Sequence, residues 1–360
     1  MSSKQKRLQK RKRNAVRAVD VARLAGCSTA TVSRAQNAPA LVSAETRARV
    51  DAAIRQLGYM PNSAARALRS ERSKMIGIVI PTLNHAIYAS LVEAAQRRLA
   101  GDGYSLFVAT HEWDLVSEAQ QVALLIERGT EGLILVGERH HADVYGSIDA
   151  AGIPHINTYV FNPESPHPCV GIDNRQAADD ITEFLIGLGH RRFGVISAAT
   201  ADNDRAATRV DGIADALARH GVTLLPEAIV QRPYSISSGR EGIQILRALP
   251  VPPTAVICGN DVLAFGALIE CREAGLAVPG DMSIVGFDNL DFTAHVVPPL
   301  TTMAVPAGEM GAAAARFVID TLKGRPTPRK IRFEPNLIAR RSTGAPAPAQ
   351  ALRTADAAVG

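Results

Sequence analysis

The sequence is poor in aromatic residues, which make up 4% of its 360 residues. Leucine, valine, isoleucine and alanine must therefore form most of any core, and the hydrophobic content of 46% is high enough for this. A chain of this length is too long for one ordinary compact domain. We expect two or three folded units.

Cysteine is also scarce, with four residues at positions 27, 169, 258 and 271. Their wide separation excludes the spacing of a metal site and of a disulfide framework, and it suits a reducing cytoplasm. Cys258 and Cys271 lie in apolar runs and are expected to be buried. The sequence predicts no metal and no cofactor.

Long hydrophobic runs are missing as well. No run approaches the roughly 20 apolar residues that a membrane span needs. The N-terminus is basic, but no apolar stretch follows it as in a signal peptide. We therefore expect a cytoplasmic protein, associated with the nucleoid, that has no membrane partner.

Charge is distributed unevenly along the chain. Residues 1–74 contain 17 Lys and Arg against 4 Asp and Glu, a net charge of +13, whereas the remainder has a net charge of −8. Residues 1–17 hold eight basic residues and no acidic one, without apolar periodicity, so this arm is predicted to be disordered. A basic end on a mildly acidic body is typical of a protein that binds nucleic acid, although a charged tail for solubility is the alternative.

Three short helices are predicted after the arm, at about 19–25, 29–37 and 44–57. Gly26 ends the first, and Ser28 and Ser43 are good N-caps for the second and third. A further segment, 62–69, has helical propensity but a weak apolar face, so alone it should be marginal. Because it lies between two domains, we expect it to fold on contact with a partner.

From residue 75 the pattern changes to alternating strands and helices. Unbroken apolar strands in such an alternation indicate parallel sheets that are covered on both faces. Two similar doubly wound lobes are predicted, with a ligand cleft between the carboxyl ends of their strands. The expected strands are 75–80, 105–109, 132–136, 193–196, 254–258 and 282–287, and the expected helices are 86–100, 115–128, 174–188, 206–219, 238–248 and 261–274.

The string DVARLAGCSTATVSRAQN at 20–37 has the form of a helix-turn-helix. A helix that enters a major groove needs small or polar residues at its start and donors that reach a base or phosphate. Thr29, Ala30 and Thr31 are the small residues, and Ser33, Arg34 and Asn37 are the donors. Val32 and Ala35 can face inward. On pattern alone, a plain helical subdomain remains the alternative.

Longer strings make the comparison specific. DVARLAG, TATVSR, VSAETRARV and LGYMPNSAARAL, followed by GHRRFGVI, GNDVLAFGAL and VPGDMSIVGFDN, resemble the lactose-repressor (LacI) family of bacterial regulators in order and spacing. The resemblance covers about 18–343. It implies an all-α helix-turn-helix domain followed by a two-lobed periplasmic-binding-protein-like domain.

The resemblance also implies roles in DNA binding. Thr29 and Ala30 are expected to read bases, Arg34 to contact a base or the backbone, and Asn37 to contact a phosphate. The segment after Pro61 is expected to form a hinge helix, with Leu68 wedged into the minor groove and Asn62 and Arg69 among the DNA contacts. Burial against the next domain is the alternative for Leu68.

The chain departs from the family pattern at three places. Arg17-Ala18-Val19 replaces a capping Thr or Ser, so the first helix should be less well capped. Ala35 and Gln36 replace two aliphatic residues, and the basic arm is longer than in the family. These differences leave the operator sequence open, and the long arm should add salt-sensitive, non-specific affinity.

For the cleft, the resemblance implies polar groups and aromatic faces suited to a sugar or sugar acid. Asn260 has helix capping as its alternative role, and Arg209 and the tyrosines have structural alternatives. A purine or another metabolite stays open. The expected effector contacts are Tyr88, Glu138, Tyr159, Arg209, Tyr234, Asn260 and Asp288.

These observations predict a transcription regulator, most simply a repressor, that binds a palindromic operator as a homodimer and responds to a small-molecule effector. A ligand-independent architectural regulator is the alternative. An enzyme and a periplasmic solute-binding protein are disfavoured, because catalytic motifs and a signal peptide are missing. The expected boundaries are 1–17 for a disordered arm, 18–60 for the helix-turn-helix domain, 61–74 for hinge and linker, 75–172 and 304–328 for lobe 1, 173–303 and 329–343 for lobe 2, and 344–360 for a disordered tail.

Overall fold

The computed structural model describes residues 16–59 and 72–347. The chain divides into two compact units, one within residues 1–73 and the other within 74–360. The predictions for most of the basic arm, for the hinge helix and for the far C-terminal end concern residues outside the described ranges. This applies to Asn62, Leu68 and Arg69 among the expected DNA contacts.

The described part of the first unit is helical. It consists of α2 (Ala18–Ala25), α3 (Thr29–Asn37), the 3-10 turn η1 (Pro39–Leu41) and α4 (Ala44–Leu57). These bounds match the three predicted helices to within one residue. Val32 and Ala35 are buried as expected and pack with Val21 and Val50 of the neighbouring helices.

The helix ends follow the predicted local signals. The hydroxyl oxygens of Ser28 and Ser43 accept the backbone N–H groups of Thr31 at 3.0 Å and Thr46 at 3.3 Å. Gly26 follows α2 with a φ of 62°, the left-handed conformation that glycine adopts without strain. Each helix therefore begins or ends where a polar cap or a glycine satisfies its free backbone groups.

The start of α2 is the exception that the sequence predicted. The guanidinium of Arg17 cannot accept a backbone N–H, so the residue before the helix supplies no cap. The carboxylate of Asp20 accepts the backbone N–H of Arg17 at 2.9 Å and thus satisfies one donor of the first turn. An acidic side chain at this end also interacts favourably with the helix dipole.

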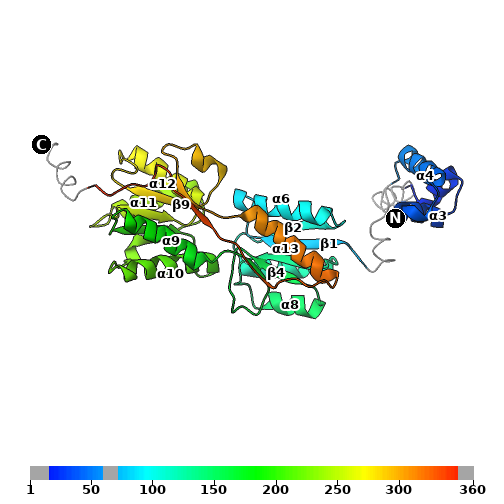
Figure 1. Ribbon diagram of the computed structural model, residues 1–360, viewed down its shortest axis with the longest axis horizontal. Coiled ribbons are helices and arrows are strands. Elements are labelled where there is room, and N and C mark those ends of the chain that lie inside the picture. The colour runs from blue at the N-terminus through cyan, green and yellow to red at the C-terminus, as the bar shows by residue number, and fades with distance from the viewer. Residues whose placement is uncertain (1–15, 60–71, 348–360) are drawn as a thin grey trace, which may run out of the picture. The chain divides into compact units, whose positions relative to one another are not determined.

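The second unit contains two six-stranded sheets, which we call the sheets of lobe 1 and lobe 2 (Figure 1). The lobe 1 sheet has the order β11-β5-β4-β3-β1-β2 and the lobe 2 sheet the order β12-β10-β9-β8-β6-β7. Lobe 1 contains β1 (Met75–Ile80), β2 (Ser105–Thr110), β3 (Gly132–Val136), β4 (His155–Thr158), β5 (Cys169–Gly171) and β11 (Lys330–Arg332). Lobe 2 contains β6 (Phe193–Ser197), β7 (Ile229–Gln231), β8 (Ala255–Cys258), β9 (Ser283–Asp288), β10 (Thr301–Ala304) and β12 (Asn336–Ile338).

Helices cover both faces of each sheet. In lobe 2, α11 and α12 lie over one face, and α9 and α10 over the other (Figure 1). The helices of lobe 1 are α6 (Ala86–Ala100), α7 (Leu115–Glu127), α8 (Asp143–Ala151) and α13 (Ala307–Leu322). Those of lobe 2 are α9 (Asn174–Gly187), α10 (Asp204–Arg219), α11 (Ile236–Arg247) and α12 (Asp261–Glu273), with the 3-10 turns η2 (Pro226–Ala228) and η3 (Asp291–Ala294).

The predicted doubly wound parallel sheets are confirmed. Among the described strands, only the β10–β12 pair is antiparallel. The central strands are buried on both faces, which explains their unbroken apolar sequences. Cys258 and Cys271 are buried as expected.

The predicted last crossing between the lobes is wrong by a few residues. The prediction assigned 329–343 to lobe 2, but β11 belongs to lobe 1, where Ile331 is aligned with Val170 of the parallel strand β5. Ile331 also packs, half-buried, against the lobe 1 core, and this contact explains why the strand stays there. The chain crosses after Arg332 and joins lobe 2 as β12.

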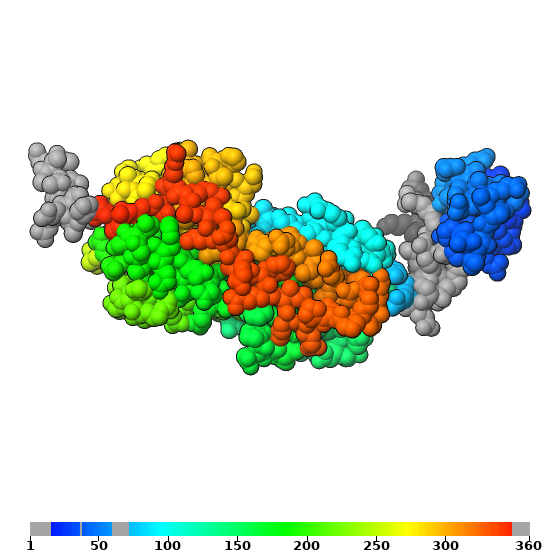
Figure 2. Space-filling model, in the orientation of Figure 1, coloured from blue at the N-terminus to red at the C-terminus, as the bar shows by residue number. Residues whose placement is uncertain are grey.

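The C-terminal part of the chain contacts both lobes. Figure 2 shows it in orange and red, running from lobe 1 back along lobe 2. The predicted tail from 344 does not begin there, because the Gly344 carbonyl is 2.9 Å from Nε2 of the buried His190. The Gly344 N–H also donates to the hydroxyl of Ser283 at 3.1 Å. No helix within the described ranges is both long and apolar enough to traverse a lipid bilayer.

The packing of α6 against α13 depends on a glycine. A Cβ atom on Gly311 of α13 would lie 2.2 Å from the backbone oxygen of Leu91 on α6. We expect Gly311→Ala to force the helices apart and to lower the free energy of unfolding by about 1–3 kcal/mol. Urea unfolding of the purified protein measures this change.

The same helix offers a matched control. A Cβ atom on Gly308 would meet only the Ala94 side chain, at 3.9 Å. Gly308→Ala should be neutral or slightly stabilising, because alanine is the better helix former. Equal destabilisation by both substitutions would contradict the close-approach argument.

Candidate effector pocket and DNA-reading helix

The expected DNA-reading residues of α3 lie on its solvent side. Thr29, Ala30 and Arg34 are exposed, and Thr31 and Ser33 are half-buried, whereas Val32 and Ala35 face the core. The side chain of Asn37 is outside what the structure describes. The first unit thus presents the start of α3 to solvent, as a helix that enters a groove requires.

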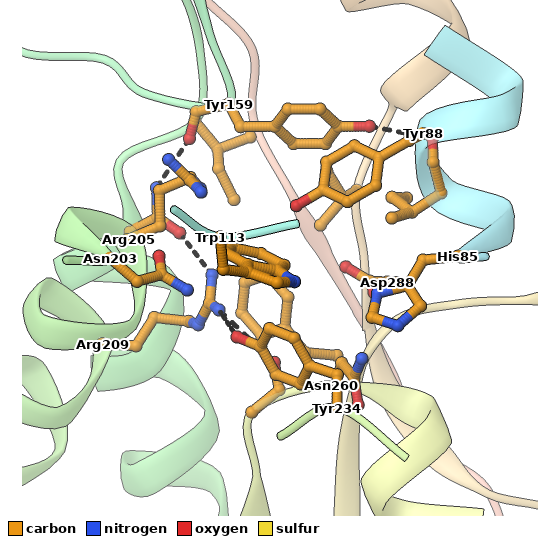
Figure 3. Close-up of a pocket in the computed structure, with 16 residues that line it drawn as sticks. His85, Tyr88, Trp113, Tyr159, Asn203, Arg205, Arg209, Tyr234, Asn260 and Asp288 are labelled. Atoms are coloured by element: carbon orange, nitrogen blue, oxygen red, sulfur yellow. Dashed lines mark hydrogen bonds between the residues drawn. The ribbon is translucent and has the colours of Figure 1, made fainter. Parts of the chain in front are cut away.

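A pocket lies between the two lobes, where loops after the strands of both sheets converge (Figure 3). His85 and Tyr88 follow β1, Trp113 follows β2, and Tyr159 follows β4. Lobe 2 supplies residues from the loops or ends of β7, β8 and β9 and from α10. This is the cleft that the strand pattern predicted.

Most of the expected effector contacts come together here. The sequence-predicted residues that line the pocket are Tyr88, Tyr159, Arg209, Tyr234, Asn260 and Asp288. Glu138 does not line it, and its expected effector contact stays a prediction. Its Oε2 accepts the side-chain N–H of Asn162 at 3.0 Å, and this contact holds it in a neighbouring hollow of the cleft.

Arg209 is fixed at the centre of the pocket by neutral acceptors (Figure 3). It donates to Oδ1 of Asn174 at 2.8 Å, to the Tyr234 hydroxyl at 3.3 Å and to the Gly259 carbonyl at 3.4 Å. The guanidinium also lies 4.5 Å from the ring centre of Phe287, a cation–π contact. Its Nε is buried and has no protein partner, so one donor remains for a ligand.

Asp288 lies at the end of β9 in a strained turn. Its φ is 112°, which is unfavourable for a residue with a side chain, whereas the φ of 57° at Asn289 is in the left-handed region that asparagine tolerates. The start of α12 holds this turn in place, because Oδ2 of the buried Asp261 accepts the N–H of Leu290 at 2.7 Å. Thr302 accepts the Asn289 N–H at 3.3 Å. Strain that is fixed by its surroundings in this way is frequent at binding sites.

The two neighbouring carboxyls, Asp288 and Asp261, ionise with difficulty. Burial, together with the charge of Asp261, raises the pKa of Asp288 well above its ordinary value. Burial raises the pKa of Asp261 to about 7, and hydrogen bonds from Thr302 and Leu290 limit the rise. A carboxyl of this kind can donate a hydrogen bond as well as accept one.

Asn260 has the capping role that the sequence left open, and its effector contact stays a prediction. Its Oδ1 accepts the N–H of Leu263 at 2.9 Å and so caps α12. The residue also lines the pocket. Because the side-chain oxygen is engaged, its amide N–H₂ is the part that can serve a ligand.

The tyrosines have unequal freedom. The Tyr159 hydroxyl donates to the Ile87 carbonyl at 2.8 Å, and its ring is buried, which raises the pKa of the phenol. Tyr88 is also buried, and the two rings meet edge to face with centroids 5.5 Å apart. Tyr234 is only half-buried. We therefore assign Tyr159 mainly to the pocket wall and regard Tyr234 as the ring more open to a ligand.

Several pocket residues escaped the sequence analysis. His85, Trp113, Asn203 and Arg205 line the pocket beside the predicted residues. Trp113 is the only tryptophan of the chain, and this rarity in an aromatic-poor sequence was a usable signal. Arg205 had no local signal, because its position depends on how the lobes meet.

The pocket is nearly filled by its own side chains. Its free volume is about 40 Å³, which suits a few water molecules. A neighbouring hollow between Trp113, Ala198 and Tyr234 has a free volume of about 380 Å³. The lobes are therefore closed over the inner pocket in this conformation.

Comparisons with known proteins match both units. Residues 17–62 match the model of bacterial regulatory proteins of the lacI family, and residues 182–343 match that of a periplasmic binding protein-like domain. The lac repressor dimer bound to operator and the anti-inducer ONPF is 27% identical with a TM-score of 0.82, over 92% of this chain and 99% of that one. A LacI-family transcriptional regulator from Silicibacter pomeroyi is 26% identical, also with a TM-score of 0.82, over 91% of this chain and 99% of its own.

The sequence relatives are transcriptional repressors. The repressor CytR of Escherichia coli (strain K12) is 35% identical over 316 residues, which are 88% of this chain and 92% of the relative. The repressor PurR of Pasteurella multocida (strain Pm70) is 30% identical over 328 residues, covering 90% of this chain and 97% of its own. Similarity at this level along nearly the whole chain, together with the helix-turn-helix unit and the two lobes, shows that the protein belongs to the LacI family of DNA-binding transcription regulators.

Proposed function

We propose that this protein is a repressor that binds a palindromic operator as a homodimer and responds to a sugar or sugar acid in the interlobe pocket. The pocket carries the proposal, because it unites an unused Arg209 donor, the Asp288 carboxyl and the Tyr234 ring. Such a set can bind hydroxyls or a carboxylate on one side and the face of a sugar ring on the other.

An exposed sheet edge supports the dimer. β2 is the outer strand of the lobe 1 sheet, and its Phe107 and Val108 are 44% and 40% exposed. Leu124 of α7 continues this apolar surface. An unpaired strand edge with apolar side chains favours association with another chain, and a second copy of this chain would cover it.

The operator is tested by sequencing genomic fragments that the purified protein captures. A dimer with two reading helices should enrich one palindrome of roughly 14–20 base pairs. Enrichment without a palindrome would instead support the ligand-independent architectural reading, in which the basic arm dominates binding. The nearly filled pocket makes this alternative worth testing.

The effector is tested by the fluorescence of Trp113, the only tryptophan of the chain. Because this ring lines the pocket, a ligand that enters should change its emission saturably. A panel of monosaccharides and sugar acids, followed by operator-release assays with any that bind, examines the proposed class. Binding of purines alone would reject that class and leave the regulator role intact.

A substitution in the hinge segment tests the wedge role that the family resemblance implies. Leu68 lies outside the described residues, so this prediction rests on sequence alone. We expect Leu68→Ala to weaken specific operator binding by about tenfold or more, because an apolar wedge stabilises the kinked duplex. Non-specific binding should change little. Gel-shift titrations with operator and scrambled DNA compare the two, and equal losses would reject the wedge.

A further inference from the structure

The two lobes are joined by a charged contact that needs no ligand. Asp204, the first residue of α10 in lobe 2, accepts the backbone N–H of Glu138 at 2.7 Å. Glu138 lies in the turn after β3 of lobe 1. A carboxylate that accepts a backbone N–H across a cleft is a charge-assisted bond, stronger than one between neutral groups.

The next residue, Arg205, reinforces this contact. Its side chain is buried, and Nη1 donates to Oδ1 of Asp204 at 2.8 Å. The guanidinium lies against Gly137 of lobe 1, because a Cβ atom there would be 1.8 Å from Nη1. Gly137 also has a φ of 89°, so only glycine gives both the turn and the space.

Two buried side chains of lobe 1 hold the turn at Gly137 and Glu138 in place. His140 has one ring nitrogen 3.2 Å from the Gly137 carbonyl and the other 2.8 Å from Oε1 of Glu118. Both His140 and Glu118 are at most 1% exposed at their side chains. The Gly137–Glu138 turn is therefore fixed to α7, in the position in which it contacts Asp204 and Arg205.

We propose that Asp204 and Arg205 form a latch with the Gly137–Glu138 turn and that this latch closes the effector cleft before an effector is bound. The inference rests on the proposed function, since it concerns regulation of the same pocket. A latched pocket with about 40 Å³ of free volume excludes a sugar. The effector therefore binds only the unlatched fraction, and the latch lowers its apparent affinity.

The experiment measures cleft opening in the full-length, ligand-free protein. Trp113 of lobe 1 and Tyr234 of lobe 2 meet across the cleft with ring centroids 5.5 Å apart. Acrylamide quenching of Trp113 fluorescence therefore reports opening. Loss of a hydrogen bond to a charged group shifts an equilibrium by about 10- to 100-fold. We expect Asp204→Ala and Arg205→Ala each to raise the quenching constant at least about twofold.

Arg219→Ala is the matched control. Arg219 lies on the same helix and pairs with Asp179 and Glu183, all within lobe 2. Its loss should leave quenching unchanged. Equal quenching in the control and in both latch variants, with normal circular dichroism, would overturn the proposal.

Hydrogen–deuterium exchange provides a second measurement. Asp204→Asn, which preserves size and helix start, should speed exchange at the Glu138 amide by about tenfold, because the asparagine oxygen is a weaker acceptor than the carboxylate. An unchanged rate would also reject the latch, even where an alanine variant fails to fold. Neither measurement uses DNA or effector, so failure of the latch and failure of the proposed regulator role remain distinguishable.

Discussion

Asp288→Ala should abolish the response to effector while operator binding stays at the wild-type level. The Asp288 carboxyl lies in the pocket, whereas operator contacts are expected from α3, in a different folding unit. Removal of the carboxyl leaves hydrogen-bond donors of the ligand unpaired. The binding free energy lost in this way typically exceeds the net contribution of the hydrogen bond itself. Operator release by the ligand identified with Trp113 fluorescence measures the response.

A second substitution separates ligand binding from the turn. At a φ of 112°, alanine is strained but glycine is not. If Asp288 serves only as a turn residue, Asp288→Gly should respond to effector normally or better. If it binds the effector, Asp288→Gly and Asp288→Ala should both fail. A responsive glycine variant would remove Asp288 from the proposed site.

Asp261→Asn should change how stability depends on pH between about 4 and 7. In the folded protein burial raises the pKa of Asp261 to about 7, whereas the ordinary value is 3.8. The folded state therefore keeps a proton that the unfolded chain releases. The contribution of Asp261 to the free energy of unfolding is therefore complete below the pKa of the unfolded chain. It is lost as the pH rises through about 7. Each pKa unit corresponds to about 1.4 kcal/mol, so the effect amounts to a few kcal/mol.

The measurement must distinguish the effect of the Asp261 carboxyl from that of buried histidines. These histidines make the free energy of unfolding rise with pH, whereas Asp261 makes it fall. Burial lowers the pKa of His155 to about 4, from 6.5, so its contribution is lost as the pH falls. Chemical unfolding of wild type and Asp261→Asn across this range gives, as the difference between the two curves, the contribution of Asp261 together with its effect on the pKa of Asp288. Parallel curves would contradict the burial argument. Asp261→Asn also replaces one acceptor of the turn by a donor, which adds a pH-independent loss.

The helices within residues 16–59 could be predicted to within one residue because their signals are local. Ser28 and Ser43 mark helix starts, and Gly26 marks an end, by interactions within a few residues. The buried strands were equally readable from their apolar runs. Short edge strands such as β7 and β11 were not, because three residues carry no recognisable period.

The pocket could be predicted only in part. Asn260 and Asp288 follow buried strands, so the direction of the chain places them at the cleft. Trp113 and Arg205 line the same space through contacts with the opposite lobe, which no local pattern encodes. The placement of Glu138 in the neighbouring hollow has the same origin, since Asn162 binds its side chain and Asp204 its backbone N–H. The helix α13 was not predicted, although its alanine-rich sequence favours one.

The interleaved course of the chain sets an order of events during synthesis. Five of the six strands of the lobe 2 sheet, β6 to β10, are made by residue 304, and β12 and the segment up to Gly344 follow. Lobe 1 is begun first but waits for α13 and β11, which arrive after residue 306. Until then the surface that Phe317 and Val318 later cover remains open to water. Lobe 1 is thus begun before lobe 2 but is still incomplete when most of lobe 2 has been made, and a nascent chain that stops near residue 300 would leave the ribosome with that surface bare.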